Sequence, residues 1–196
     1  MIQLLTVPLS AQLNIFVCSL APIQDQLVLA RQGIDELREK HPDSTPSNVK
    51  AVYMSPWHSH KMTDKFNPLC SSVTTIATWV SQTYLSANLE ALNLSLVVTD
   101  CWGILYDKAD HTIKHNHFPA EFACSIYLEA DPDCAPLVFD GGVKVQPVPG
   151  MLVMFPGILN HEVPATEGKR TVVAMNLNKL ATFEKLQKPT LELTQG

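Results

Sequence analysis

The feature of this sequence that most constrains its fold is a series of short apolar segments in its second half. From Ser95 onward, runs rich in Val, Ile, Phe and Tyr alternate with Asp, Gly, Pro and Asn. Residues 140–142 (Asp-Gly-Gly) and 148–150 (Val-Pro-Gly) are turn signals between such runs. Segments this short and closely spaced are typical of a sandwich or barrel rather than of alternating strands and helices. The pattern predicts about seven or eight strands arranged as a jelly-roll barrel.

The first half of the chain has a mixed pattern. Residues 13–20 (LNIFVCSL) predict a strand, and residues 23–40 place apolar side chains at helical spacing with basic residues near the end. The His41-Pro42 pair stops this helix. A second helix is predicted over residues 70–93, beginning near Ser71 or Ser72.

These patterns predict the fold class and the domain organisation together. The chain of 196 residues fits one domain, spanning residues 1–196. The predicted class is α+β, mainly β: a double-stranded β-helix (jelly-roll) barrel with N-terminal helices packed on one sheet. Residues 1–95 form the helical and mixed N-terminal part, residues 96–178 the jelly-roll core, and residues 179–196 a tail that begins as a short helix.

Composition and charge argue against several classes of partner. The net charge is −5 and no block of Lys or Arg stands out, which argues against nucleic acid. Residues 1–22 are apolar but lack a basic start and are interrupted by Pro8 and Gln12, so we expect no signal peptide and no membrane partner. Five scattered cysteines without a CxxC pair favour a reducing, cytoplasmic location. A homodimer remains possible.

Histidine placement indicates the chemistry. His115 and His117 form an HxH pair inside a strand pattern, and side chains two apart on a strand point to one face, so both imidazoles can converge on one ion. Imidazole suits iron, zinc, copper and nickel, so the pair does not choose the metal. A second HxH, His58 and His60, lies in a predicted loop at the barrel mouth without a distal partner, and is interpreted as a surface or packing feature.

A distal element raises the case for a metal site. Residues 147–161 (PVPGMLVMFPGILNH) read as a turn, a buried strand, a second Pro-Gly turn and a histidine that opens the next strand. Because a barrel returns later strands beside earlier ones, His161 can come back against the HxH pair. Arg170 follows nine residues later and shares a strand face with Val172, Ala174 and Asn176. A guanidinium buried there needs a partner, and a ligand carboxylate matches its fork.

With these motifs the chain resembles the 2-oxoglutarate and Fe(II)-dependent oxygenases. The likeness rests on the HxH pair, the distal histidine after FPG, the arginine nine residues on and the asparagine six beyond it. It covers about residues 48–178, including NVKAVYMSPWHSH, WGILYDKADHTIKHNH and VQPVPGMLVMFPGILNHEVPATEGKRTVVAMNLN. It is greatest to the oxygenase group common in phages and marine bacteria, in which the usual HxD pair often reads HxH. Ile104 and Ala109 depart from that group's Asn and Gly.

The resemblance implies a role for each matching residue. It implies that His115 and His161 are metal ligands, with His117 in the place of the usual carboxylate. Arg170 would bind the distal carboxylate of 2-oxoglutarate, helped by Tyr127. Asn176 would line the pocket. Iron(II) and 2-oxoglutarate are the implied cofactor and co-substrate, and the implied activity is hydroxylation of an unidentified small-molecule or peptidyl substrate.

Alternatives remain at this point. Glu121 or Asp110 could supply the carboxylate that non-haem iron sites usually contain. A cupin-type metalloprotein would use HxHxxxE, ending at Glu121, together with His161, but its flanking glycines are missing and it does not require Arg170. A barrel that has lost its metal would lack one of the histidines or Arg170, and all of them are present. A zinc hydrolase would require a general base beside the metal, and only Glu121 and Glu162 lie near the motifs.

Overall fold

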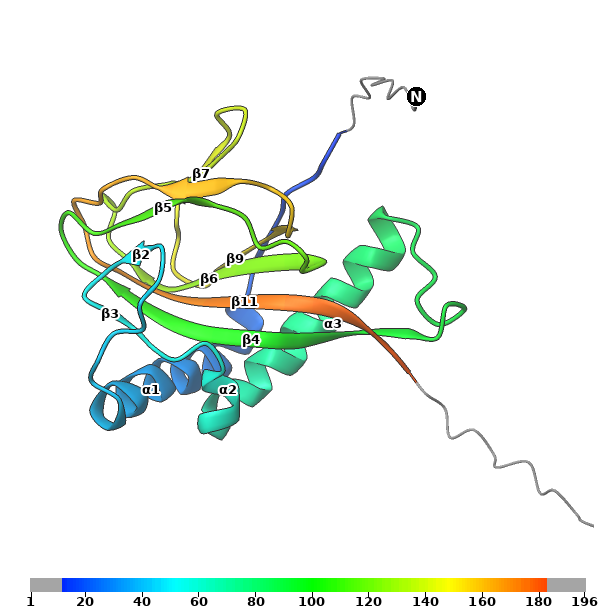
Figure 1. Cartoon of the computed structure of the whole chain (residues 1–196), viewed down its shortest axis with the longest axis horizontal. Coiled ribbons are helices and arrows are strands. Elements are labelled where there is room, and N and C mark those ends of the chain that lie inside the picture. The colour runs from blue at the N-terminus through cyan, green and yellow to red at the C-terminus, as the bar shows by residue number, and fades with distance from the viewer. Residues whose placement is uncertain (1–11, 183–196) are drawn as a thin grey trace, which may run out of the picture.

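The computed structural model describes residues 12–182 as a mostly-β structure of two antiparallel sheets and three α-helices (Figure 1). The large sheet contains, in order, β1 (Phe16–Ser19), β9 (Met151–Pro156), β6 (Phe122–Ala130), β11 (Arg170–Ala181), β4 (Leu94–Tyr106) and β3 (Tyr53–Met54). The small sheet contains, in order, β2 (Val49–Lys50), β5 (His111–His115), β10 (His161–Val163), β7 (Leu137–Phe139) and β8 (Lys144–Val145).

The eight strands from β4 to β11 divide evenly between the two sheets. β4, β6, β9 and β11 lie in the large sheet, and β5, β7, β8 and β10 lie in the small one. Both predicted turns are present: Gly141, Gly142 and Gly150 have positive φ, which glycine adopts without the steric cost of a Cβ. The prediction of about seven or eight strands after residue 95 is therefore confirmed, with β4 beginning one residue earlier.

The helices lie on one side of the molecule. α1 (Gln24–Lys40) and α3 (Asn67–Tyr84) cover the face of the large sheet turned away from the small sheet, and α2 (Ser59–Met62) is a short turn between them (Figure 1). Short 3-10 turns precede α1 and α3, at Ala21–Ile23 and Asp64–Phe66. α1 approaches β4 so closely that a Cβ on Gly103 would lie 2.3 Å from Ile34, which only glycine permits.

The prediction for the first helix is confirmed, and the prediction for the second helix is wrong at both ends. α3 begins at Asn67, before the expected start. Pro68 fits its first turn, because the backbone N–H that proline lacks would have no partner within the helix there. The helix ends at Tyr84, and the chain then turns through Ser86 and Asn93, both with positive φ. The apolar residues beyond Tyr84 extended the periodic pattern without extending the helix.

The first half of the chain also supplies strands. β1 confirms the strand expected over residues 13–20, whereas β2 and β3 were not predicted. The helix expected at the start of the tail is wrong for residues 179–181, because β11 continues to Ala181 as the partner of β4. Residues 183–196, the rest of that tail, lie outside the described residues.

The core has two layers that share the large sheet. One layer packs α1 and α3 against the sheet, and it includes the alternate β11 residues Val173, Met175 and Leu177. The other lies between the two sheets and includes Val172 and Ala174 from the opposite face of β11. The face predicted for Arg170 and its neighbours is thus the one turned toward the small sheet. Among residues 12–182, no helix is long and apolar enough to cross a membrane.

Candidate metal centre

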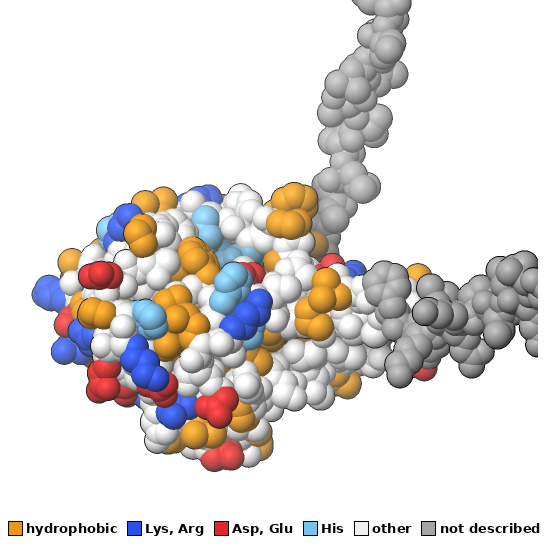
Figure 2. All heavy atoms as spheres, turned by 60° about the horizontal axis from the view of Figure 1, so that its bottom comes forward, with side chains coloured by type: hydrophobic (Ala, Val, Ile, Leu, Met, Phe, Trp, Pro, Cys, Tyr) orange, Lys and Arg blue, Asp and Glu red, His pale blue; other side chains and the backbone are white. Residues whose placement is uncertain are grey.

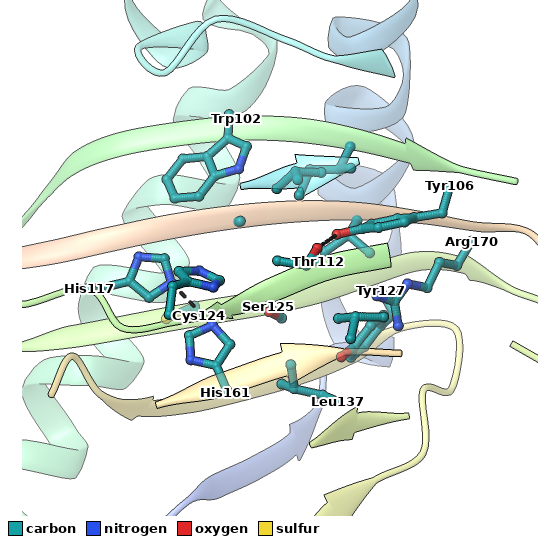
Figure 3. Close-up of a pocket in the computed structure, with 16 residues that line it drawn as sticks. Trp102, Tyr106, Thr112, His117, Cys124, Ser125, Tyr127, Leu137, His161 and Arg170 are labelled. Atoms are coloured by element: carbon teal, nitrogen blue, oxygen red, sulfur yellow. Dashed lines mark hydrogen bonds between the residues drawn. The ribbon is translucent and has the colours of Figure 1, made fainter. Parts of the chain in front are cut away.

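Three histidines from distant parts of the sequence meet between the sheets, as predicted. β10 pairs antiparallel with β5 so that His161 lies directly opposite His115. The ring centroid of His161 is 4.4 Å from that of His115 and 5.1 Å from that of His117 (Figure 3). One nitrogen from each of the three rings lies within 4.8 Å of the others. We call these three residues the histidine triad.

His117 reaches the triad by a different route from the one the sequence indicated. β5 ends at His115, so His117 lies in the following loop and does not share a strand face with it. The loop is held by the His117 amide, which donates to the Gly157 carbonyl at 2.7 Å. A Cβ on Gly157 would lie 2.1 Å from the Ala120 carbonyl oxygen, so the FPG turn must carry glycine for this loop to pack.

The triad has the spacing of metal ligands, and two of its rings have the matching tautomer. His117 Nε2 and His161 Nε2 are 3.3 Å apart. Two nitrogens bound to one ion at about 2.1 Å, at angles between square and tetrahedral, are separated by about 3.0–3.4 Å. Nδ1 of His115 lies 2.8 Å from the Ile113 carbonyl, and Nδ1 of His161 lies 3.0 Å from that of Leu159. Since a carbonyl only accepts, each Nδ1 carries the proton and each Nε2 keeps a free lone pair.

The surroundings keep these imidazoles neutral. Burial, followed by the neighbouring histidines, lowers the pKa of His117 from 6.5 to about 3. Burial lowers the pKa of His161 from 6.5 to about 4, and it also lowers that of His115. Only a neutral imidazole can bind a metal, so the triad is in its ligating state at neutral pH.

Neither carboxylate considered from the sequence belongs to this cluster. Among the described residues, the group of ligating side chains within 4.8 Å consists of the three histidines alone. Glu121 instead pairs with Lys179 at 2.7 Å. Asp110 accepts hydrogen bonds from the amides of Val52 and Asp107. The geometry therefore favours His117 as the third ligand over either carboxylate.

A cavity extends from the triad to Arg170 (Figure 3). Arg170 is only 2% exposed, so the alternative of a surface arginine is wrong. Its Nη1 donates to the Ala135 carbonyl at 2.8 Å, whereas its buried Nε has no hydrogen-bond partner. Among residues 12–182 no carboxylate lies within 4.0 Å of this guanidinium. An arginine held this way has donors left for a ligand.

Aromatic side chains surround that guanidinium, and the sequence revealed only one of them. Tyr127, singled out earlier, is buried with its ring 5.9 Å from the Arg170 guanidinium carbon. Tyr106 is nearer, at 4.3 Å, and its hydroxyl lies 2.6 Å from that of Thr112. Tyr106 lies opposite Arg170 in the β4–β11 pairing. Tyr106 could be recognised only from the register between β4 and β11, which no local sequence pattern specifies.

Asn176 lies farther from Arg170, on the other side of the triad. It lines a groove together with Trp102 and His117 rather than the cavity that holds the arginine. Its Nδ2 donates to Asp100 at 3.2 Å, and its Oδ1 is buried without a hydrogen-bond partner. Asn176 thus lies beside the triad but outside the cavity that holds Arg170, and its predicted role in co-substrate binding stays a prediction.

The second HxH pair forms no such cluster. The rings of His58 and His60 are 6.3 Å apart, and no third ligating side chain joins them among the described residues. His58 Nε2 lies 3.2 Å from Asp100 Oδ1, which also lines the groove. The interpretation as a surface pair near the mouth is consistent with this arrangement.

Solved structures share this architecture. A Pseudomonas putida prolyl-4-hydroxylase aligns with a TM-score of 0.60 and 17% identity, over 84% of this chain and 92% of that one. A Trichoplax adhaerens prolyl hydroxylase, solved with a hypoxia inducible factor peptide fragment, gives 0.61 and 16% over 84% and 83%. The α-ketoglutarate-dependent epimerase SnoN gives 0.62 and 13% over 83% and 76%. No family model and no curated protein matches the sequence.

The chain therefore has the fold found in prolyl hydroxylases and other 2-oxoglutarate-Fe(II) oxygenases. At these identities the likeness establishes the fold, and the activity has to be argued from the residues. The charge distribution adds one constraint: on the face drawn in Figure 2, basic and acidic side chains are interspersed and histidines lie beside hydrophobic residues. Such a mixed surface does not favour nucleic acid.

Proposed function

We propose that this protein is a 2-oxoglutarate- and O2-dependent non-haem Fe(II) oxygenase of the hydroxylase type. The observation that carries the proposal is one cavity with three neutral imidazoles at one end and a buried, incompletely paired guanidinium at the other. The eight strands β4 to β11 would then be the jelly-roll core of a single domain. The cupin alternative has less support, because Glu121 pairs with Lys179 outside the triad.

The residues present fit both groups. Three neutral imidazoles within ligating distance, two of them with a free Nε2 lone pair, suit Fe(II), and three protein ligands leave coordination positions open. The orphaned Nε of Arg170 offers a donor to the distal carboxylate of 2-oxoglutarate. Together with O2, the bound pair supplies an oxidant for a substrate C–H bond, and 2-oxoglutarate becomes succinate and CO2.

The chain's own residues would position these groups and exclude water. The carbonyls of Ile113 and Leu159 fix two imidazole rings. Three neutral ligands leave the full charge of a dication at the site, which increases its attraction for a dianionic oxoacid. The rings of Tyr106 and Tyr127 would keep the Arg170 end of the cavity apolar, where a charged hydrogen bond is stronger than in water.

The finer assignments extend the proposal. The Trichoplax neighbour was solved with a peptide fragment. This supports a peptidyl substrate, and a small-molecule substrate is the alternative. Kinship with the phage and marine bacterial group rests on the HxH pair and the spacing of His161, Arg170 and Asn176. The cysteines at five described positions are all free, which supports a reducing compartment.

Anaerobic spectroscopy tests the proposal. Protein loaded with Fe(II) and 2-oxoglutarate should develop a weak metal-to-ligand charge-transfer band in the visible, and Fe(II) alone should not. Absence of the band at full metal occupancy would rule out 2-oxoglutarate as the co-substrate. Arg170→Met should shift formation of the band to higher 2-oxoglutarate concentration while leaving metal occupancy intact.

A further inference from the structure

A groove lies beside the histidine triad, on the side away from Arg170. Its volume is about 370 Å³, and it shares Val49, Trp102, His115 and His117 with the cavity described above. The lining residues that belong to the groove alone include Trp57, Asp100 and Asn176. A molecule bound in this groove would lie next to the proposed iron, so we call it the substrate groove.

The charged groups of the substrate groove are unbalanced. Asp100 is its one acidic lining residue, and neither Lys nor Arg lines it. One carboxylate oxygen of Asp100 accepts from Asn176 Nδ2 and Thr99 Oγ1, at 3.2 and 3.0 Å. The other faces His58 Nε2 at 3.2 Å. The His58 side chain is 54% exposed, and such surface pairs contribute about 0–1 kcal/mol, so a ligand cation can displace it.

Two buried polar atoms have no partner, one on Asn176 in the groove and one on Trp102, which separates the groove from the cavity. Asn176 Nδ2 donates a hydrogen bond to Asp100, and the buried Oδ1 of Asn176 accepts no hydrogen bond. Trp102 is 3% exposed, and its Nε1 donates to nothing among the described residues. An unmet buried polar group costs about 1–3 kcal/mol, so a ligand that pairs with these atoms gains affinity. The free acceptor of Asn176, which lines the groove, is matched by an N–H of the ligand.

Aromatic rings complete the arrangement. Trp57 is 37% exposed and packs against Trp102 with ring centroids 4.7 Å apart. Indole faces attract ammonium and guanidinium groups, most strongly where a carboxylate is close. Bound 2-oxoglutarate would also offset the charge of the iron dication, which reduces its repulsion of a cation in the groove.

We propose that the substrate groove binds the side chain of a basic amino-acid residue, arginine or lysine, in a peptide. Asp100 and Asn176 Oδ1 receive its N–H groups, and the indoles pack on its alkyl stem and charge. Asp100 is then the residue that determines specificity. This inference rests on the proposed function, because it makes that bound residue the substrate or its immediate neighbour.

A matched pair of probes tests the charge requirement. Acetyl-arginine methylamide and its neutral isostere acetyl-citrulline methylamide are titrated into the full chain loaded with Fe(II) and 2-oxoglutarate without oxygen. Tryptophan fluorescence reports binding, in a Trp79→Phe background that leaves the two groove indoles as the signal. We expect the arginine probe to bind about tenfold or more tightly than the citrulline probe. Equal affinities would overturn the inference.

Variants locate the effect. Asp100→Asn should reduce the preference to within about twofold, whereas Asp25→Asn changes the net charge equally, at an exposed position on α1, and should leave the preference intact. An equal loss in both variants would mean non-specific attraction and contradict the assignment. If Asp100→Asn does not fold, Trp57→Leu serves in its place. It should weaken the arginine probe several-fold and the citrulline probe less, and an unchanged ratio would count against the site.

The same samples separate the two proposals. A charge-transfer band together with equal binding of the two probes overturns the inference alone. Absence of the band overturns the proposed function, and the inference about its substrate falls with it. A band together with selective binding of the arginine probe supports both.

Discussion

The two HxH pairs of this chain have the same spacing and different surroundings. His115 and His117 meet His161 with ring centroids no more than 5.1 Å away, whereas the rings of His58 and His60 are 6.3 Å apart and belong to no group of three candidate ligands among the described residues. His115 gains its partner because β10 pairs with β5 in a register that places His161 opposite it. Strand pairing, rather than spacing, thus distinguishes a candidate metal site from a surface pair.

Removing the distal histidine should break this difference most completely. We expect His161→Ala to weaken Fe(II) binding by at least ~100-fold, since one of three ligands is lost, and calorimetric titration measures it. The double variant His58→Ala, His60→Ala should bind iron as the wild type does. Iron lost equally from both variants would mean that the two pairs share a site.

The opposite end of the cavity gives the next largest effect. Arg170→Met removes the guanidinium and retains most of the side-chain volume, so we expect 2-oxoglutarate to bind about 100-fold more weakly. Iron affinity should change less than about threefold, because Arg170 belongs to no ligand cluster. Titrations of both ligands on one preparation measure the two affinities. Parallel losses would assign Arg170 a structural role instead.

The role of Gly157 in positioning the loop that carries His117 can be tested separately. Gly157→Ala places a methyl group against the Ala120 carbonyl and should displace the loop that carries His117. We expect an unfolding free energy lower by about 1–3 kcal/mol and iron affinity lower by about tenfold. Gly142→Ala is the control, since no atom lies within 4 Å of its Cβ position and only the backbone is strained. We expect Gly142→Ala to lower the stability without lowering the iron affinity. If both variants lose iron affinity equally, the loop that carries His117 does not have the proposed role.

Acid should destabilise the metal-free protein through the triad. The folded-state pKa values of His117 and His161, about 3 and about 4, lie below the ordinary 6.5. The unfolded chain therefore takes up protons first, and stability present above pH 6.5 is lost as the pH falls toward 4. The urea midpoint should fall between pH 7.5 and pH 5 by less in His161→Gln than in the wild type. Equal falls would show that the triad does not control this loss.

The smallest expected effect comes from restoring a carboxylate. His117→Asp recreates the common set of two histidines and one carboxylate, so we expect iron affinity to remain within about tenfold of the wild type. His117→Ala should lose far more, and iron titrations of the two variants give the comparison. If the alanine variant binds iron as tightly as the wild type, position 117 is not a ligand.

The sequence predicted the parts of this site that follow from alternation and from barrel closure. The inward face of β11, with Arg170 at its start, follows from the period of two along a strand. The return of His161 to His115 follows from the topology of a barrel. The position of His117 did not follow in this way, because β5 ends before it and the loop depends on the close approach of Gly157.

The remaining errors share a cause. Tyr106, Trp102 and Asp100 face the site because of the register between β4 and β11, which no local pattern specifies. The predicted end of the second helix lies too late in the sequence, because the apolar residues after Tyr84 keep helical spacing although the chain turns there. Local sequence thus predicted the elements and one face, while the residues that meet across the sheets required the register.

The most direct test of the central claim is a crystal structure of the protein with Fe(II) and 2-oxoglutarate, grown without oxygen and measured at the iron absorption edge. The account predicts one anomalous peak bound by Nε2 of His115, His117 and His161, with 2-oxoglutarate extending from it to Arg170. Iron bound by a carboxylate of the chain in place of His117, or a co-substrate that does not reach Arg170, would contradict it.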